Sequence, residues 1–355
     1  MSDDLKLSGF ARRDLLKAGA AAAGLAYAAG PLSAQGPAKK GNRIDIHAHV
    51  WTDEYLDMME RFGVKDTSVQ RKKGAGPEEA DMAKRFAQMD AAKVTKQILS
   101  ICPQAPHFED KNNAVAAARA ANDLYADVVR RWPARFAAFA ALPLPHVDES
   151  LKELDRAMAQ PGFVGATIGT FPAGRSPADP SFFPVYEELN RRGTILFIHP
   201  TGCNIYSPLI AEHHMTWMVG APMEDTMSVL HLMEAGIALK FPKMKIVNCH
   251  LGGALPMLYQ RFDNQYGWED PRFPEKPSIA AKRMWYDSVG HGHPPALRAA
   301  VDTLGADRIV LGSDFPYEAG ELYKRAIGYI EQAGLKKEDA TQILDFNAAR
   351  LLGML

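Results

Sequence analysis

The sequence contains few cysteines, little net charge and no long apolar run in its main body. Only three cysteines, Cys102, Cys203 and Cys249, occur among 355 residues, and none belongs to a Cys-x-x-Cys pair. An odd number of widely separated cysteines argues against a disulfide framework, so we expect free and mostly buried thiols. The formal net charge of −1 gives no indication of a nucleic-acid partner or of binding to an anionic membrane surface.

The body of the chain also lacks any apolar stretch of the roughly 20 residues that a membrane-spanning helix needs. With 47% hydrophobic and 23% charged residues, the composition is that of a globular protein with one large core. We therefore expect no membrane anchor in the mature protein and no second domain.

The first 34 residues form a segment of a different kind. Arg12 and Arg13 precede an alanine- and glycine-rich stretch that ends at Ala34. This pattern resembles a twin-arginine export signal and predicts a periplasmic protein that is cleaved after Ala34. An amphipathic N-terminal helix on a cytoplasmic enzyme is the alternative. We assign residues 1–34 to the signal peptide, 35–42 to a linker and 43–355 to the folded domain.

After the linker, apolar segments of strand length alternate with segments of helical period up to the C-terminus. Eight such strand–helix units favour an α/β fold, a single-domain (β/α)8 TIM barrel, over a doubly wound sheet. The predicted strands are 44–49, 95–101, 135–142, 163–170, 194–199, 245–250, 284–289 and 308–313, and the predicted helices include 78–92, 112–131, 148–160, 182–192, 223–240 and 294–304.

Two histidines end the first predicted strand. His47 and His49 are two residues apart, and residues i and i+2 of a strand lie on one face, so both rings can reach one metal ion. A His-x-His pair in this position is typical of metal ligation. The alternative is that both are ordinary strand-end histidines whose nitrogens are satisfied by hydrogen bonds.

Three further polar residues stand where predicted strands end. His199 ends the fifth strand, His250 ends the sixth, and Asp314 directly follows the eighth. Catalytic groups of a (β/α)8 barrel lie at the C-terminal ends of its strands. We therefore predict that these residues and the two strand-one histidines form one site at that end of the barrel.

Longer motifs around these residues resemble the amidohydrolase superfamily, and within it the aminocarboxymuconate-semialdehyde decarboxylase-like branch. The resemblance implies one divalent metal ion, zinc with manganese as the alternative, bound by His47, His49, His199 and Asp314. It also implies that His250 is the acid/base residue beside a metal-bound water and that Asp314 takes part in catalysis. The motifs are DIHAH at 45–49, GATIGT at 165–170, FPVY at 183–186, FIHP at 197–200, WMVGAPMEDT at 217–226, KFPKMKIVNCHLGGALP at 240–256, WYDS at 285–288 and GSDFPY at 312–317.

The fourth predicted strand carries no residue that could bridge two metal ions. Many two-metal members of the superfamily use a lysine or glutamate at its end, whereas residues 164–170 read VGATIGT. We therefore expect a single metal ion. The resemblance implies a decarboxylase of an aromatic or muconate-semialdehyde-type acid, and a metal-dependent hydrolase of a ring-cleavage product, lactone or ester is the alternative. A barrel that binds without turnover would lack at least one of the five strand-end residues, and none is missing.

A small anionic organic acid is the substrate class that the resemblance implies. Related enzymes hold a substrate carboxylate with an arginine after the first strand, and Arg71 is our candidate, although the same basic run could be a solvated loop. Trp217, which could equally pack in the core, and Phe315, next to Asp314, are further candidate substrate contacts. The resemblance also implies a homodimer.

Other polar residues have less certain roles. Asp287 could orient a ligand histidine or make a packing hydrogen bond. We place the pair His213-His214, and also His291 and His293, in loops without a catalytic role, and we expect Cys249 to lie in inert core.

Overall fold

Eight parallel strands form a ring in the computed structural model, which describes residues 42–202 and 207–355. Each strand pairs with the next in chain order. Ile46 N donates to Leu311 O at 2.9 Å and Asp314 N donates to His47 O at 2.9 Å, so the last strand is tied back to the first. The predicted (β/α)8 barrel is confirmed. The strands are β1 (Arg43–Ala48), β2 (Val94–Leu99), β3 (Phe136–Ala141), β4 (Phe163–Gly169), β5 (Ile195–His199), β6 (Lys245–Asn248), β7 (Trp285–Asp287) and β8 (Ile309–Val310).

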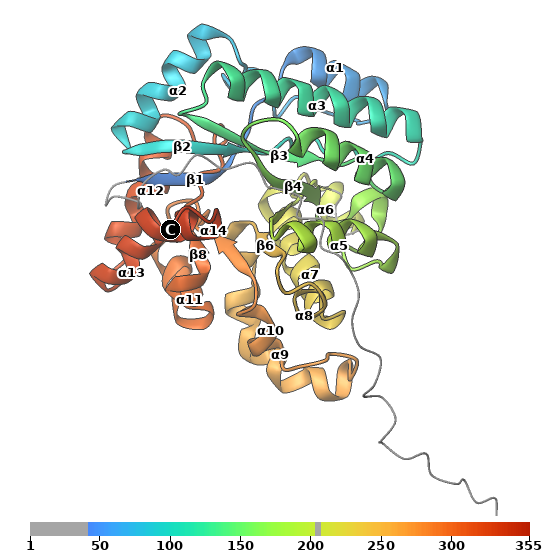
Figure 1. Cartoon of the computed structure of the whole chain (residues 1–355). Helices are drawn as coiled ribbons and strands as arrows, with labels where there is room; N and C mark the ends of the chain where they lie inside the picture. The colour runs from blue at the N-terminus through green and yellow to red at the C-terminus, as the bar shows by residue number, and fades with distance from the viewer. Residues whose placement is uncertain (1–41, 203–206) are drawn as a thin grey trace, which may run out of the picture. The chain divides into compact units, whose positions relative to one another are not determined.

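Helices cover the outside of the strand ring (Figure 1). None of the helices in the described part of the chain is long and apolar enough to cross a bilayer. The predicted signal peptide and the linker up to residue 41 lie outside the described residues. The α-helices are α1 (Asp53–Arg61), α2 (Glu79–Ala91), α3 (Lys111–Arg131), α4 (Val147–Met158), α5 (Phe183–Arg192), α6 (Pro208–Ala211), α7 (Ala221–Glu234), α8 (Ile237–Lys240), α9 (Leu255–Glu269), α10 (Pro277–Ala281), α11 (Pro294–Leu304), α12 (Glu321–Gln332), α13 (Lys337–Thr341) and α14 (Asn347–Leu351).

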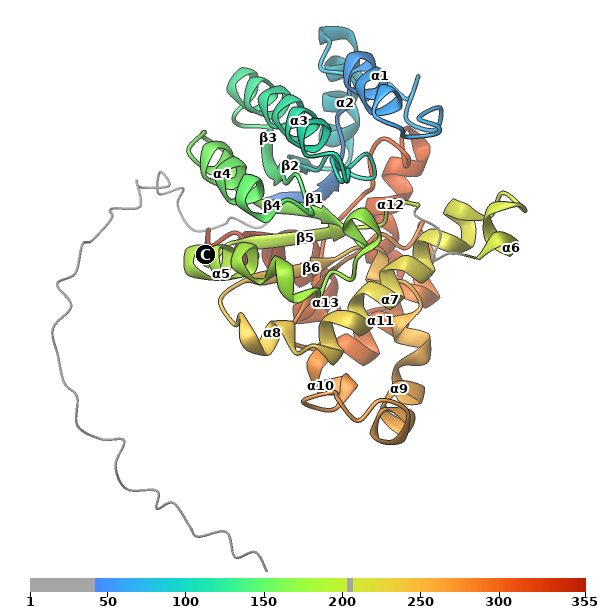
Figure 2. The same cartoon turned by 90° about the vertical axis from the view of Figure 1, so that its right-hand side faces the viewer.

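The helix predicted over residues 223–240 is wrong as a single element. The chain breaks at Gly236, whose φ of +64° belongs to the left-handed region that favours glycine. A Cβ at this position would also lie 2.9 Å from the ring of Pro274. Two helices, α7 and α8, result. Figure 2 shows that α6 and the chain leading into α7 project from the side of the barrel.

The core has two parts, one inside the strand ring and one between the strands and the helices. Inside the ring, the rings of Phe139 and Phe197 stack with centroids 4.9 Å apart. Phe197 also contacts His47 edge-on at 5.3 Å, so this pair forms the floor beneath the strand-end histidines. Cys102 and Cys249 are free and buried, as expected, while Cys203 lies outside the described residues.

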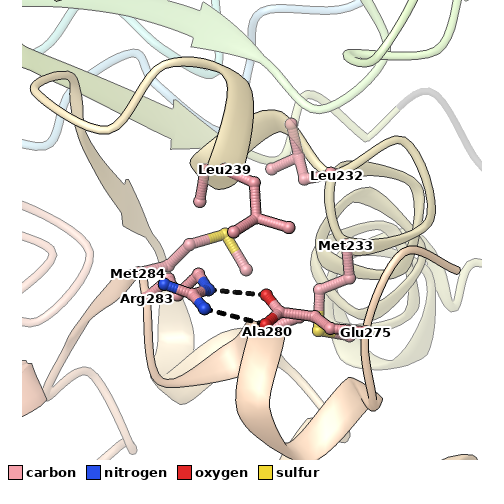
Figure 3. A pocket seen from close by; sticks show the side chains of 9 residues that line it. Leu232, Met233, Leu239, Glu275, Ala280, Arg283 and Met284 are labelled. Carbon is pink, nitrogen blue, oxygen red and sulfur yellow. Dashed lines mark hydrogen bonds and ion pairs between the residues drawn. The ribbon is translucent and has the colours of Figure 1, made fainter. Parts of the chain in front are cut away.

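A small pocket between α7, α8 and α10 lies apart from the strand-end residues (Figure 3). Glu275 closes one side by accepting hydrogen bonds from Arg283 Nε at 2.6 Å and Nη2 at 2.8 Å. None of the predicted metal ligands lines this pocket. It is therefore a feature of helix packing and not of the predicted site.

We expect the stacked phenylalanines to be a main source of barrel stability. Phe139→Ala should lower the free energy of unfolding by about 3–5 kcal/mol, because it removes a fully buried ring and leaves a cavity. Guanidinium chloride unfolding followed by circular dichroism measures this loss. The control is Leu322→Ala on α12, where 42% of the leucine is exposed and the change should stay within about 0.5 kcal/mol. Equal losses in the two variants would contradict the expectation.

Candidate metal centre and active site

Four side chains from three parts of the barrel meet at the C-terminal ends of the strands. All four are buried, and one potential ligand atom of each lies within 4.8 Å of those of the others. They come from the end of β1, the end of β5 and the segment after β8. The structure thus brings together the residues that the sequence predicted as metal ligands, which are His47, His49, His199 and Asp314.

Each histidine of this cluster has its Nδ1 atom engaged away from the centre. His49 Nδ1 lies 2.9 Å from Ser100 O, and His199 Nδ1 lies 2.6 Å from Pro200 O. His47 Nδ1 lies 2.6 Å from the carboxylate of Asp287. Because these oxygens accept hydrogen bonds, each Nδ1 carries the proton. The Nε2 lone pairs are then directed into the cluster, which is the arrangement that metal-binding histidines use.

The atoms that face one another in the cluster require a cation between them. His49 Nε2 lies 3.0 Å from Asp314 Oδ1, and His47 Nε2 lies 3.2 Å from the same oxygen. The Nε2 atoms of His47 and His199 are buried without a hydrogen-bond partner. Lone pairs and a carboxylate at these distances repel one another unless a proton or a metal ion lies between them. Three nitrogens and one oxygen suit a divalent transition metal ion.

The pKa values in the cluster are shifted in different directions by burial and by neighbouring charges. Burial disfavours charge on His47, but Asp287 and Asp314 outweigh burial and raise its pKa to about 9. Burial opposes ionisation of Asp314 too, yet the charge of His47 and hydrogen bonds from the histidines hold its pKa well below the usual value. Burial and the neighbouring His47 lower the pKa of His199. These carboxylates therefore keep a proton on His47, and metal binding would release it.

A second acid/base group lies beside the cluster. His250 Nδ1 is 2.8 Å from Asp225 Oδ2, and His250 Nε2 is 3.6 Å from Asp314 Oδ2. The backbone N–H of His250 donates to Asp287 Oδ1 at 2.8 Å and is held there in a left-handed conformation with φ of +52°. Asp287 therefore orients both His47 and His250, which decides between the two roles that its sequence position left open.

His250 and Asp225 form a proton-holding pair. Burial raises the pKa of Asp225 to about 7. Burial alone would lower the pKa of His250, but Asp225 and Asp314 raise it well above its ordinary value. The pair therefore keeps a proton beside the cluster near neutral pH. Sequence reasoning missed the role of Asp225 because this residue lies within α7, away from any strand end.

Arg71 and Lys73, in the basic run between α1 and α2, have different surroundings. Arg71 is ion-paired with carboxylates of α1, at 2.7 Å from Asp57 and 3.3 Å from Glu60. Lys73 Nζ instead lies 5.4 Å from the ring centroid of Tyr317, and no ion pair of Lys73 with a described carboxylate is present. The Tyr317 ring is 5.9 Å from His49. Lys73 is thus the cation of this loop that lies towards the cluster.

The other predicted substrate contacts differ in their surroundings. Trp217 is 41% exposed, and its ring packs close to Gly202, three residues after His199. Phe315 is buried against Arg85 and Tyr323, so its ring lies among the helices. His291, which we placed in a loop without a role, stacks parallel to His250 with centroids 6.5 Å apart and binds Glu318 at 2.9 Å. The pair His213-His214 lies in an exposed turn, and His293 precedes α11.

The fold and the cluster define a (β/α)8 barrel with a candidate metal centre at the strand ends. A family model described as Amidohydrolase matches residues 44–354. The chain belongs to this family.

Relatives and solved structures show what the chain is similar to. It is 25% identical over 336 residues to 2-amino-3-carboxymuconate-6-semialdehyde decarboxylase from Dictyostelium discoideum, covering 88% of this chain and 92% of the relative. It is 30% identical over 289 residues to gamma-resorcylate decarboxylase from Rhizobium sp., covering 75% and 85%. The structure of dihydroxybenzoic acid decarboxylase from Polaromonas sp. JS666, with bound manganese and the inhibitor 2-nitroresorcinol, superposes with a TM-score of 0.76 at 26% identity and covers 88% and 97%.

We expect the cluster to bind one divalent ion per chain. Competition with a chelator should give a dissociation constant for Zn²⁺ or Mn²⁺ that rises by at least about 100-fold in His199→Ala, because even partners that only hydrogen-bond a ligand contribute 10–100-fold. His214→Ala, in an exposed turn, is the matched control and should bind like the unmodified protein. Unchanged affinity in His199→Ala would show that the ion binds elsewhere.

Proposed function

We propose that the chain catalyses the metal-dependent decarboxylation of a small aromatic or muconate-semialdehyde-type carboxylic acid. The observation that carries this proposal is the His250–Asp225 pair, which places a proton donor 3.6 Å from Asp314 of the candidate metal cluster. The names of the relatives supply the substrate class, since they are decarboxylases of such acids. His47, His49, His199 and Asp314 would hold the ion, which we propose to be zinc, with manganese as the alternative.

A divalent ion bound in the cluster would act as a Lewis acid and hold substrate oxygens. The side chains of His250 and Asp225 would then hold and transfer the proton. His250 Nε2 delivers a proton to the carbon that carries the carboxylate, the bond to the carboxylate breaks, and carbon dioxide leaves while the bonding electrons return to the unsaturated system. Asp225 accepts the hydrogen bond from Nδ1 throughout and stabilises the charged imidazole before transfer. Asp314 would help to hold the ion, and its Oδ2 lies 3.6 Å from the proton-donating His250 Nε2.

We propose that the protein is a homodimer. Four apolar side chains before α7 are exposed, and an apolar surface of this kind is normally covered by a partner. They are Met215, Trp217, Met218 and Val219. We also propose export to the periplasm by a twin-arginine signal, which the Arg12-Arg13 pair and the following apolar stretch support.

Carbon dioxide release is the direct test of the reaction. We expect metal-loaded protein to release it from at least one acid among 2,6-dihydroxybenzoate, 6-methylsalicylate and 2-amino-3-carboxymuconate-6-semialdehyde. Asp225→Asn should lower kcat by about 10²–10⁴-fold, because the acid/base group loses its charged partner. Asp302→Asn, on the exposed face of α11, should leave kcat unchanged. Consumption of lactones or esters with uptake of water, and no carbon dioxide from any acid, would replace the lyase by the hydrolase.

Lys73 and Arg71 provide a matched test of substrate recognition. Lys73→Met should raise KM for the acid by about 10-fold, the effect of losing roughly 1.4 kcal/mol of charge pairing at a partly exposed site, with a smaller effect on kcat. Arg71→Met should change KM less, because its guanidinium is already paired with carboxylates of α1. Steady-state kinetics on the identified acid measures both. A larger KM effect in Arg71→Met would reverse the assignment.

A further inference from the structure

A buried polar cluster lies directly behind the candidate metal ligands and has no role in the chemistry proposed above. It consists of Asp45, Arg85, Gln97 and Ser313, which come from β1, α2, β2 and the segment after β8, and we call it the support cluster. The exposed fraction of each of these residues is 1% or less. Buried polar groups of this kind are costly unless they are mutually satisfied, so their arrangement is specific.

An irregularity in β1 places Asp45 in this cluster. Asp45 pairs with Gln97 and Ala48 pairs with Leu99, so β1 uses three residues where β2 uses two. Without the extra residue, the alternation of a strand would put Asp45 on the same face as His47. The carboxylate of Asp45 instead meets Gln97, whose amide also contacts Arg85 of α2. The bulge therefore separates the two metal-facing histidines from the aspartate that precedes them.

The carboxylate of Asp45 accepts four hydrogen bonds, two of them from the backbone N–H groups of the candidate ligand His47 and of Ser313, which precedes Asp314. Oδ1 accepts from His47 N at 3.1 Å and from Ser313 N at 3.0 Å. Oδ2 accepts from Ser313 Oγ at 2.5 Å and from Gln97 Nε2 at 2.8 Å. Four donors occupy the acceptor sites of one carboxylate, so its position is fixed from four directions.

Ser313 restricts the position of the neighbouring Asp314 through its own hydrogen bonds. Its Oγ accepts from Phe315 N at 3.2 Å, while its own N–H and O–H donate to Asp45. Asp314 lies between these two anchored residues with a left-handed φ of +61°, a conformation that costs free energy for a residue with a side chain. The hydrogen bonds on both sides hold that conformation.

Arg85 holds the backbone at His49, the third candidate ligand that contacts the support cluster. Its Nη1 donates to His49 O at 2.8 Å and its Nε donates to Gln97 Oε1 at 2.7 Å. The guanidinium also lies 4.5 Å from the ring centroid of Phe315. Gln97 thus connects the guanidinium of Arg85 with the carboxylate of Asp45. Together Arg85 and Asp45 contact the backbone of β1 and of the segment after β8, which carry the candidate ligands.

We propose that the support cluster, with Asp45 at its centre, is the positioning device that sets the metal affinity of the site. Asp45 and its partners act through the backbone of His47, His49 and Asp314 and touch no reacting atom. The proposal rests on the metal centre of the proposed function. Four ligand atoms bind an ion tightly only when their separations match its coordination distances, so small displacements of the backbone weaken binding.

Two substitutions test this device. Asp45→Asn replaces two acceptor oxygens by one and turns an amide N–H₂ towards donors, and Ser313→Ala removes the Oγ that links Asp45 to Phe315 N. We expect the dissociation constants for Zn²⁺ and for Mn²⁺, each measured by chelator competition, to rise by about 10–100-fold in both variants. The melting temperature of the metal-free proteins, and its increase on adding the metal, should be measured alongside.

Asn122→Ala is the matched control. Asn122 is equally buried and exchanges hydrogen bonds with the backbone of Ala141 and with Glu153, far from the ligands in sequence. It should lower the melting temperature of the metal-free protein and leave the metal affinity unchanged.

The outcomes separate the two proposals. If the unmodified chain binds neither ion, the metal centre fails and the positioning role fails with it. If the unmodified chain binds an ion and both Asp45→Asn and Ser313→Ala bind it as tightly, the positioning role alone is overturned. Should Asp45→Asn not fold, Ser313→Ala decides by itself, because it removes one oxygen and leaves the buried charges in place.

Discussion

The C-terminal end of the strand ring depends on one electrostatic requirement. A cation must lie among the Nε2 atoms of His47, His49 and His199 and the carboxylate of Asp314. Each imidazole has its Nδ1 proton committed to an oxygen outside the cluster, so none of the three rings can relieve the repulsion by changing tautomer without losing a hydrogen bond. In a buried site such repulsion is weakly screened. Without a metal ion, the proton that Asp287 and Asp314 hold on His47 relieves part of this repulsion, and a bound ion would take its place. This electrostatic requirement argues for a metal centre more strongly than the presence of histidines alone.

The same carboxylates connect the candidate metal centre to the proton donor. Asp287 holds the ring of His47 with one oxygen and the backbone of His250 with the other. Asp314 contacts the cluster through Oδ1 and approaches His250 through Oδ2. One carboxylate would therefore hold the ion and also lie beside the proposed proton donor His250. In the proposed reaction, Asp287 and Asp314 are the two side chains that would connect metal binding with proton transfer.

The sequence alone predicted the eight strands, the barrel and the polar residues near their C-terminal ends, because each depends on local pattern. The predicted bounds were wrong at two of these ends, since β6 ends at Asn248, before the left-handed turn at His250, and β8 ends at Val310. Alternation marks the strands, and chain order then places His47, His199 and Asp314 at one end of the ring. The role of Asp225 could not be predicted in this way, since its contact with His250 joins a residue of α7 to the turn after β6. Arg71 and Lys73 are two residues apart in one loop, and only the fold shows which of them meets the carboxylates of α1 and which lies over Tyr317. The bulge in β1 depends on pairing with β2 and leaves no mark on β1 itself.

The barrel closes where β1 meets the chain after β8, and these two segments also carry three of the four candidate metal ligands. We call this junction the seam. Asp314 N donates to His47 O, and His49 N donates to Phe315 O at 2.8 Å, so two of the backbone bonds that join the last strand to the first involve candidate metal ligands. The two sides of this seam carry His47, His49 and Asp314, whose side chains converge on one point. An ion bound there would link both sides of the closure, and its binding free energy would add to the stability of the folded barrel. Ring closure and metal binding are then two aspects of one interaction, and the buried Asp45–Ser313 contact behind the seam stabilises both.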